Sequence, residues 1–430
     1  MDARRFRIVL AALTLLGFAV RVAYALAADV PKGFGDDLWF HSVANGLVHG
    51  RGFSDPFNSV VHGALVFGNT GPPSPTAFHP PLFPALLAIP SAVGLDSYTA
   101  HQIVGCALGA AAIPAMGLVG RRLAGEAAGV AAAAIAAVFI PIVARDSLLL
   151  SESVYGLLIA LTLLCFLRLR ERPSARRALE LGAVIALAAL TRSEALLLLL
   201  LLAAPLAFAL ERGRRLRTFA LVCVATVVVC LPWCVRNSLQ FDQPTLITTG
   251  DGSVVAGSNL HSVYYGPSIG YWDFQGLYKT PAGRHPDTNE AVQSDRWRRE
   301  GIDYAREHAS RLPAVIVARA ARTWELFPVD PGARFSLAHE QFKHIRKLEY
   351  VGQVELIAVW VLAVFGAVGL RRRGVPFWPF LVPVALVTLV SVLGHGDPRY
   401  RHAADVSLVI LAGVGLAGMK GRPWTRLSPS

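Results

Sequence analysis

The sequence predicts an all-α polytopic membrane protein, a bundle of about ten transmembrane helices with interfacial helices and a small segment outside the membrane. Three observations support this prediction: 54% of the residues are hydrophobic, only 16% are charged, and the mean hydropathy is +0.48. Such a chain carries too little polar surface to cover a water-soluble globule. The net charge of +12 comes from short basic clusters between apolar runs, which is typical of membrane topology and not of a nucleic-acid interface.

The first apolar run resembles a cleavable signal peptide, with a basic start and an Ala-Leu-Ala triplet at 25–27. Arg21, however, interrupts the run well before that triplet. A chain with many later spans also has little need of a cleaved leader. We therefore expect residues 8–28 to form a retained first helix.

Hydropathy predicts nine further spans along the chain, near residues 100–120, 126–144, 148–168, 178–191, 194–210, 217–235, 349–370, 375–394 and 403–419. With this count, the arginine-rich loops and both termini fall on one side of the membrane. The excess of positive charge identifies that side as cytoplasmic. We therefore expect a multi-pass protein of the plasma (inner) membrane with its functional residues on the extracytoplasmic side.

Two long segments remain outside under this count, a first outer loop at 29–99 and a segment at 236–348. Residues 80–94 are apolar but short and broken by prolines. Residues 312–327 carry Arg319 and Arg322 on one helix face, so we expect both stretches to form interfacial helices. The chain then divides into a transmembrane module with the first outer loop, an extracytoplasmic segment, and C-terminal transmembrane helices with a tail, at 1–235, 236–348 and 349–430.

Two adjacent carboxylates, Asp36 and Asp37, begin the first outer loop in the run GDDLWFH, which also contains His41. A half-buried carboxylate at the membrane surface can act as a general base. Equally, either aspartate can be the N-cap of an amphipathic helix from Leu38 to Val48. The pair is also a weak signal for a divalent cation, and no other cofactor is indicated.

Basic side chains recur at the outer ends of the predicted spans. Prolines hold His79 at the start of the first interfacial helix. Arg192 lies in a turn after an apolar run of about 14 residues, or about 21 Å of helix, so we expect the turn to be recessed in a protein-lined cavity. A guanidinium there suits a lipid phosphate. Arg399 and Arg401 of the last outer turn either complete a phosphate clamp or anchor the chain at the interface.

Three further acidic residues stand at the outer ends of spans. Asp146 and Glu152 belong to the run RDSLLLSES, and Glu194 follows Arg192 closely. A carboxylate at the entrance to a span costs free energy unless it is paired or faces a wet cavity, so such residues are functional candidates. For Asp146 and Glu152, the alternative is a structural ion pair with Arg145.

The chain resembles the GT-C superfamily of glycosyltransferases, in particular an actinobacterial, family 39-like branch related to protein mannosyltransferases and to the aminoarabinose transferase of lipid A. The resemblance is carried by GDDLWFHSVANGLVHGRGF, PTAFHPPLFPALLA, RDSLLLSES, GAVIALAALTRSEALLLL, PWCVRNS and GDPRYRHAADVSLVILAG. One departure is Ser193, where relatives usually have proline.

This resemblance implies a GT-C-like bundle that moves a sugar from a polyprenyl-phosphate donor to an acceptor hydroxyl of a glycan, lipid or protein, with inversion. It implies that Asp36 is the base and that Asp37 is a helper or a metal contact. It places the donor phosphate against His79, Arg192, Arg399 and Arg401, with Arg21, His41, Asp146, Glu152 and Glu194 in support.

We further expect Asp37 to raise the pKa of Asp36, which would suit a base. The alternatives are a transporter or flippase of lipid-linked sugars, and a polymerase or ligase of lipid-linked glycans.

Overall fold

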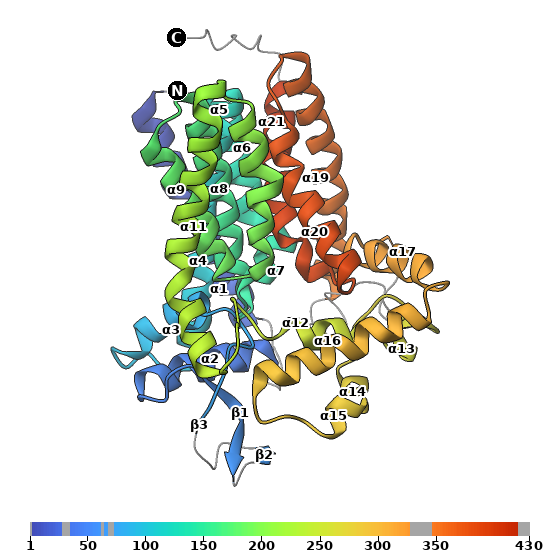
Figure 1. The fold of residues 1–430 in the computed structure, drawn as a ribbon. Coiled ribbons are helices and arrows are strands. Elements are labelled where there is room, and N and C mark those ends of the chain that lie inside the picture. The colour runs from blue at the N-terminus through green and yellow to red at the C-terminus, as the bar shows by residue number, and fades with distance from the viewer. Residues whose placement is uncertain (1, 28–34, 62–63, 68–72, 327–345, 420–430) are drawn as a thin grey trace.

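The computed structural model describes residues 2–27, 35–61, 64–67, 73–326 and 346–419 and is mainly helical. A bundle of roughly parallel helices forms one part of the molecule, and shorter helices and a small sheet cover one of its ends (Figure 1). The bundle contains α1 (Ala3–Ala27), α4 (Tyr98–Ala110), α5 (Ala112–Ala124), α6 (Glu126–Val138), α7 (Ile140–Ser147), α8 (Glu152–Glu171), α9 (Ala175–Ala189), α11 (Arg212–Gln240), α19 (Arg346–Arg372), α20 (Val382–Leu393) and α21 (His402–Met419).

Helical structure occupies all ten predicted spans, but the described helices confirm fewer crossings. Six helical segments are long and apolar enough to span a membrane, and α6 with α7 would be a seventh if this pair, bent by 54°, is one span. The remaining three runs contain shorter helices: α9, the stretch Ser193–Phe208, and the stretch Trp378–Leu393. Ser193–Phe208 is irregular, because 3₁₀ turns η1 (Ser193–Leu197) and a π-helical stretch η2 (Leu199–Ala203) precede α10 (Ala204–Phe208). The predicted count of ten spans is therefore not confirmed.

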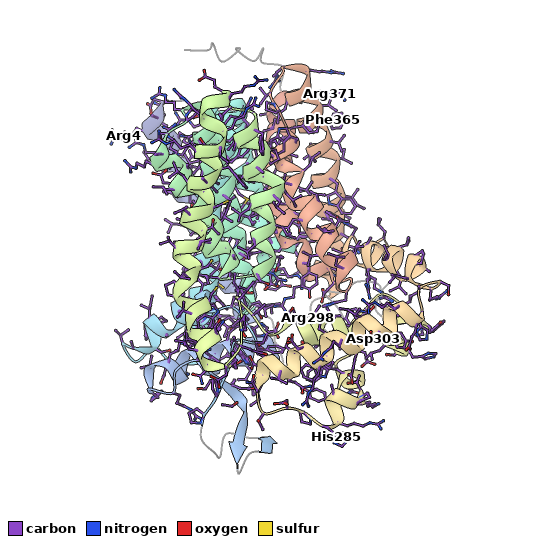
Figure 2. The ribbon with its side chains drawn as sticks, viewed as in Figure 1. Arg4, His285, Arg298, Asp303, Phe365 and Arg371 are labelled. Carbon is purple, nitrogen blue, oxygen red and sulfur yellow. The ribbon has the colours of Figure 1, made fainter. Side chains whose placement is uncertain are left out.

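The two ends of the bundle differ in composition. α1 begins and α21 ends at the same end, which we call the arginine end because it carries the short arginine-rich connections (Figure 1). Arg4 and Arg371 project there, whereas His285, Arg298 and Asp303 lie at the opposite end (Figure 2). We call this opposite end, which residues 35–97 and 241–326 cover, the loop end.

The first loop adds a small sheet that the all-α expectation missed. The described part of this loop consists of α2 (Asp36–Val48), β1 (Ser54–Val61), β2 (Ala64–Phe67), β3 (Pro73–Pro75) and α3 (Leu82–Ser91). The strands are antiparallel in the order β2-β1-β3, and Asn58 pairs with Phe67. Valine and phenylalanine favour extended backbone, but strands this short give little periodic signal in a sequence.

The second segment at the loop end consists of small helices, α12 (Asp251–Gly257), α13 (His261–Tyr264), α14 (Phe274–Leu277), α15 (Pro281–Arg284), α16 (Glu290–Glu307) and α17 (Leu312–Thr323). Helices α12 and α16 pack closely: a Cβ on Gly252 would lie 2.1 Å from the carbonyl oxygen of Ser294. Arg298 also donates to Asp251 at 2.8 Å and ties the two helices together.

Helix α17 confirms the predicted helix near 312–327 but corrects the expected position of its arginines. Arg319 and Arg322, expected on a face at the lipid interface, are 2% and 0% exposed. Their guanidinium groups donate to backbone carbonyls of Val392 and Ile269, among others. This face therefore packs against the protein, where carbonyls of loops and of the last turn of α20 supply the acceptors that a buried guanidinium requires.

Candidate functional site

Six charged side chains from distant parts of the chain meet where the loop end joins the bundle. Asp36 lies in the first turn of α2, His79 precedes α3, Glu152 begins α8, and Arg192 and Glu194 follow α9. Arg399 lies in the 3₁₀ turn η4 (Pro398–Arg401) before α21. We call these six residues, Asp36, His79, Glu152, Arg192, Glu194 and Arg399, the charge cluster.

Arg399 bridges two carboxylates at the centre of the charge cluster. Its Nη1 donates to Oδ2 of Asp36 at 2.6 Å, and its Nη2 donates to Oε2 of Glu152 at 3.3 Å. Its Nε donates to the other oxygen of Glu152. Glu152 is 1% exposed, whereas Asp36 keeps 33% of its side chain exposed. Asp36 is thus the more accessible of the two carboxylates on this guanidinium.

Arg192 provides a second guanidinium beside the first. It donates to Glu152 at 2.9 Å and to Glu194 at 2.6 Å, and its side chain is 15% exposed. The guanidinium also lies over the ring of Tyr400, 4.9 Å from the centroid. Arg192 is therefore enclosed by protein side chains, as predicted from the shortness of the preceding apolar run.

Local backbone features hold these groups in place. Gly35, in extended conformation, is the N-cap of α2, so Asp36 occupies the first helical turn instead of the cap predicted as an alternative. A carboxylate in that position is favoured by the helix dipole. Asp397 caps η4 by accepting from the backbone nitrogen of Arg399 at 2.7 Å. The backbone nitrogen of Leu82 donates to the carbonyl of Leu190 at 2.9 Å, which ties the start of α3 to the turn of Arg192.

His79 contacts the carboxylate oxygen of Asp36 that Arg399 does not. Its Nε2 lies 3.3 Å from Oδ1 of Asp36. The imidazole packs among the rings of Trp39, Phe40 and Phe78, with centroid distances of 4.7 to 4.9 Å. These contacts fix the ring and leave it 20% exposed.

The electrostatics of Asp36 contradict the expectation of a raised pKa. Burial alone would raise the pKa of this carboxyl, but the charges of Arg399 and His79 and their hydrogen bonds outweigh burial and hold it well below its usual range. The expected cause of a raised value, Asp37, points elsewhere. Asp36 in this arrangement is a stable carboxylate and a weak base.

Asp37 lies outside the charge cluster. Its carboxylate accepts a hydrogen bond from the hydroxyl of Tyr98 at 2.7 Å and is buried. On the same side of α2, Nδ1 of His41 lies 3.0 Å from Nδ1 of His101. His41 also lines an open pocket of about 340 Å³ between α2 and residues 51–56. Asp37 and His41 thus connect α2 to α4 and the first loop.

No group of three or more His, Cys, Asp or Glu residues suitable for a metal ion occurs among the residues that the structure describes. Asp36 and Asp37, considered for a divalent cation, have separate partners and do not converge on one point.

Arg401, predicted beside Arg399 as a phosphate contact, has acidic partners of its own. Its Nε donates to Asp405 at 3.1 Å, and its Nη1 lies 3.4 Å from Glu325. The side chain is 3% exposed. The described contacts therefore join Arg401 to α21 and to the end of α17, and not to the charge cluster.

Arg21 and Asp146 form a pair inside the bundle. Nε of Arg21 donates to Oδ2 of Asp146 at 2.8 Å, and the two side chains are 0% and 1% exposed. The alternative partner considered for Asp146, Arg145, is not the one observed. His402, which was noted only as part of a motif, faces the other oxygen of Asp146 at 3.4 Å.

Two residues near the charge cluster escaped the sequence analysis. Glu290 accepts from the hydroxyl of Thr76 at 2.7 Å and from the backbone nitrogen of Ala77 at 2.8 Å, which holds the segment leading to His79. His395 is 7% exposed and contacts the hydroxyl of Tyr400 at 3.0 Å. Glu290 carried no motif that would identify it, whereas His395 directly precedes the run GDPRYRHAADVSLVILAG.

Comparison with known proteins gives one family match and several structural matches. Residues 78–235 match the family described as "Dolichyl-phosphate-mannose-protein mannosyltransferase". No curated protein matches the chain.

The archaeal oligosaccharyltransferase AglB from Archaeoglobus fulgidus, in complex with an inhibitory peptide and a dolichol-phosphate, has a similar structure, with a TM-score of 0.55 and 12% identity. The similarity covers 96% of this chain and 50% of that one, so this chain spans about half the length of AglB. The apo form of the oligosaccharyltransferase from the same organism gives a TM-score of 0.53 with 16% identity, over 96% of this chain and 50% of that one. ArnT from Cupriavidus metallidurans bound to undecaprenyl phosphate gives a TM-score of 0.45 with 14% identity, over 97% and 79% of the two chains.

Proposed function

We propose that this chain, a membrane protein with the fold of the GT-C glycosyltransferases and a match to the mannosyltransferase family over residues 78–235, transfers a sugar from a polyprenyl-phosphate carrier to an acceptor hydroxyl. One observation carries the proposal: a partly exposed carboxylate, Asp36, shares the guanidinium of Arg399 with a buried one, Glu152. This arrangement supplies a base and a phosphate-binding cation at the same point.

The two guanidinium groups suit the leaving group of such a reaction. When the bond between the sugar and the lipid phosphate breaks, negative charge develops on the phosphate. Arg192 and Arg399 lie side by side on Glu152, and a guanidinium matches phosphate oxygens in a bidentate manner. Cations fixed in advance, in a half-buried site, stabilise developing charge without reorganisation. His79 adds a nitrogen beside Asp36.

The contacts of Arg399 support a route by which Asp36 becomes a better base. A donor phosphate and the carboxylates compete for the same N–H groups. Asp36 is the carboxylate to leave, because it is 33% exposed and uses one contact to Arg399, whereas Glu152 is 1% exposed and contacts both arginines. Release from Arg399 removes the main charge that lowers the pKa of Asp36.

The proposed step is a direct displacement of the lipid phosphate by the acceptor oxygen. The acceptor O–H bond breaks and its proton passes to Asp36, while the acceptor oxygen forms a bond to the anomeric carbon. The bond from that carbon to the phosphate oxygen breaks on the opposite face, and the lipid phosphate leaves as an anion among Arg192, Arg399 and His79. Attack opposite the leaving group inverts the anomeric centre.

The same proposal includes the location and the partners. A plasma membrane with the arginine end in the cytoplasm places the charge cluster on the extracytoplasmic side. There it meets a polyprenyl-phosphate sugar in the bilayer and the hydroxyl of a glycan, lipid or protein. The complex of AglB with dolichol-phosphate supports a polyprenyl phosphate as the carrier.

The test uses purified protein in lipid vesicles with radiolabelled donors, decaprenyl-phosphate mannose and decaprenyl-phosphate arabinose. We expect label to move to an added glycan acceptor, with the opposite anomeric configuration from the donor by NMR. A parallel reaction with EDTA tests for a divalent cation. Donor binding without turnover, or movement of intact donor between leaflets, would contradict the proposal and favour a transporter.

A further inference from the structure

The broken helix α6–α7 leaves backbone groups without their usual partners. An α-helix pairs each carbonyl with the N–H four residues later. The partner of the Ala137 carbonyl would be Pro141, which has no N–H. The partner of the Ala136 carbonyl would be Ile140, but that N–H donates to Glu355 at 2.8 Å. Both carbonyls lie deep in the bundle, where an unpaired polar group is costly.

Arg21 supplies the missing donors from the neighbouring helix α1. Its Nη2 donates to the carbonyl of Ala136 at 3.2 Å, and its Nη1 donates to that of Ala137 at 3.4 Å. Its Nε donates to Asp146 of α7 at 2.8 Å. One guanidinium therefore satisfies both halves of the broken helix, which a single ammonium group on a lysine cannot do with the same geometry.

The fold makes room for this contact and extends it to α21. Asp146 faces Nε2 of His402 at 3.4 Å, and His402 is 2% exposed. A Cβ on Gly109 would lie 2.3 Å from Cγ of Asp146, and a Cβ on Gly156 would lie 2.5 Å from Nε2 of His402. Two glycines thus permit the approach. Three helices meet at a buried triad, which we define as Arg21, Asp146 and His402.

Each member of the buried triad lies on a segment that leads to a different member of the charge cluster. Arg21 is on α1, the helix before Asp36; Asp146 precedes Glu152 closely; and His402 follows Arg399. These three cluster residues are in contact, because Arg399 binds both Asp36 and Glu152. Asp146 lies six residues before Glu152 and His402 three residues after Arg399, so the positions of α7 and α21 at the triad bear most directly on the buried carboxylate and the guanidinium.

We infer that the buried triad is a positioning site for the proposed transfer reaction: Arg21, by joining the broken helix α6–α7 to α1 and α21, sets the geometry of Asp36, Glu152 and Arg399. This inference rests on the proposed function. Charged groups inside a membrane protein are expensive and are kept chiefly where they serve function.

The first variant removes both charges of the pair, Arg21→Met with Asp146→Asn, because removing one alone leaves an uncompensated buried charge. The readout is the affinity for decaprenyl phosphate in lipid nanodiscs. We expect affinity to fall by about tenfold, since the geometry of the phosphate site changes. The melting temperature should fall as well, because the carbonyls of Ala136 and Ala137 lose the donors of Arg21.

The matched control removes an ion pair of the same bundle at the arginine end, Arg121→Met with Glu126→Gln, whose atoms are 3.2 Å apart. It should change affinity by less than about twofold. Equal affinities in the two double variants and wild type would overturn the inference, because a merely structural pair leaves the phosphate site unchanged.

Arg21→Lys keeps the proposal testable if the double variant does not fold. Lysine preserves the charge beside Asp146 but loses the fork that reaches Ala136 and Ala137. We expect a lower melting temperature, because buried carbonyls lose a donor. We also expect weaker decaprenyl phosphate binding and faster hydrogen exchange in residues 396–402 and 148–154. Wild-type binding and exchange in Arg21→Lys would contradict the inference.

The exchange measurement also separates this inference from the proposed function. If wild type binds no polyprenyl phosphate and transfers no sugar, the proposed function fails. The buried triad is then judged by exchange alone: a rise in both regions in Arg21→Lys supports it, and unchanged exchange contradicts it.

Discussion

Ion pairs at the two ends of the bundle differ in exposure and in how they arise. At the arginine end, Arg176 and Glu180 lie 3.0 Å apart with 88% and 26% of their side chains exposed. At the loop end, Arg399 contacts Glu152 and Asp36 with exposures of 21%, 1% and 33%. The first pair is a largely solvated contact along one helix, in which Glu180 also meets Arg168. The second set is half-buried.

The separation of the partners in sequence shows what each set requires. Arg176 and Glu180 are four residues apart, so helix geometry alone brings them together. Asp36 and Arg399 are 363 residues apart, and Glu152 and Arg399 are 247 apart. The complete fold is needed to bring these groups to one point. Exposed ion pairs would serve solubility equally well. This difference supports the proposal that the charge cluster has a role beyond stability.

The largest expected effect is on Arg399, because it contacts both the base and the buried carboxylate. Arg399→Met should lower kcat for sugar transfer by about 100- to 1,000-fold, since a fixed cation at the leaving phosphate is lost. Arg399→Lys is the matched control and should recover part of that loss. It keeps the charge but not the bidentate contact. Transfer at the wild-type rate by Arg399→Met would remove the difference between the two ends.

The next effect is on stability at Glu152. Glu152→Gln leaves two partly buried guanidinium groups without their shared carboxylate, and we expect a loss of about 3 kcal/mol in the free energy of unfolding. Glu194→Gln is the control, because Glu194 is 20% exposed and contacts Arg192 alone in the charge cluster. Its loss should be about 1 kcal/mol. Denaturant titration in detergent compares the two, and equal losses would contradict the special place of Glu152.

A smaller effect depends on pH at His395. Burial lowers the pKa of this imidazole from 6.5 to about 4. The unfolded chain then takes up its proton near pH 6.5 and the folded chain only near pH 4. The contribution of His395 to stability is present above pH 6.5 and is lost as the pH falls toward 4.

The His395→Gln variant should therefore lose less stability than wild type between pH 6.5 and pH 4.5. Melting temperatures in detergent at the two pH values measure this. His285→Gln, at an exposed position of the loop end, serves as the control and should follow wild type. A His395→Gln variant as acid-sensitive as wild type would contradict the assigned environment.

The smallest effect is expected at the arginine end. Arg176→Gln should change the free energy of unfolding by less than about 0.5 kcal/mol and leave sugar transfer unchanged, because exposed pairs along a helix contribute little. A large loss of activity in Arg176→Gln would show that the two ends do not differ as described.

Much of the fold was predictable because hydrophobic runs report directly on membrane helices. The family resemblance, the positions of the helical runs and the helices near 80–94 and 312–327 are confirmed. The count of ten spans is not confirmed, because an apolar run does not reveal the 3₁₀ and π turns of Ser193–Phe208 or the bend at Phe139. The small sheet of the first loop was missed for the same reason, since its strands are too short to show a period.

The charge cluster was predictable in its members but not in its pairing. Candidate residues could be found from their place at the ends of spans. Which carboxylate meets which guanidinium depends on tertiary structure, and so Asp37 and Arg401 have partners outside the cluster. The predicted rise in the pKa of Asp36 was wrong, because adjacency in sequence does not determine the direction of a side chain in a helix.

The central claim is that Asp36, and not its neighbour, is the base. The most direct measurement compares sugar transfer from decaprenyl-phosphate donors by wild type, Asp36→Asn and Asp37→Asn, all with normal melting temperatures. We predict that Asp36→Asn abolishes turnover while decaprenyl phosphate binding is retained or strengthened, since a competitor for Arg399 is removed. Asp37→Asn should keep most of its activity, because its carboxylate contacts Tyr98. Near-normal turnover by Asp36→Asn would contradict the account.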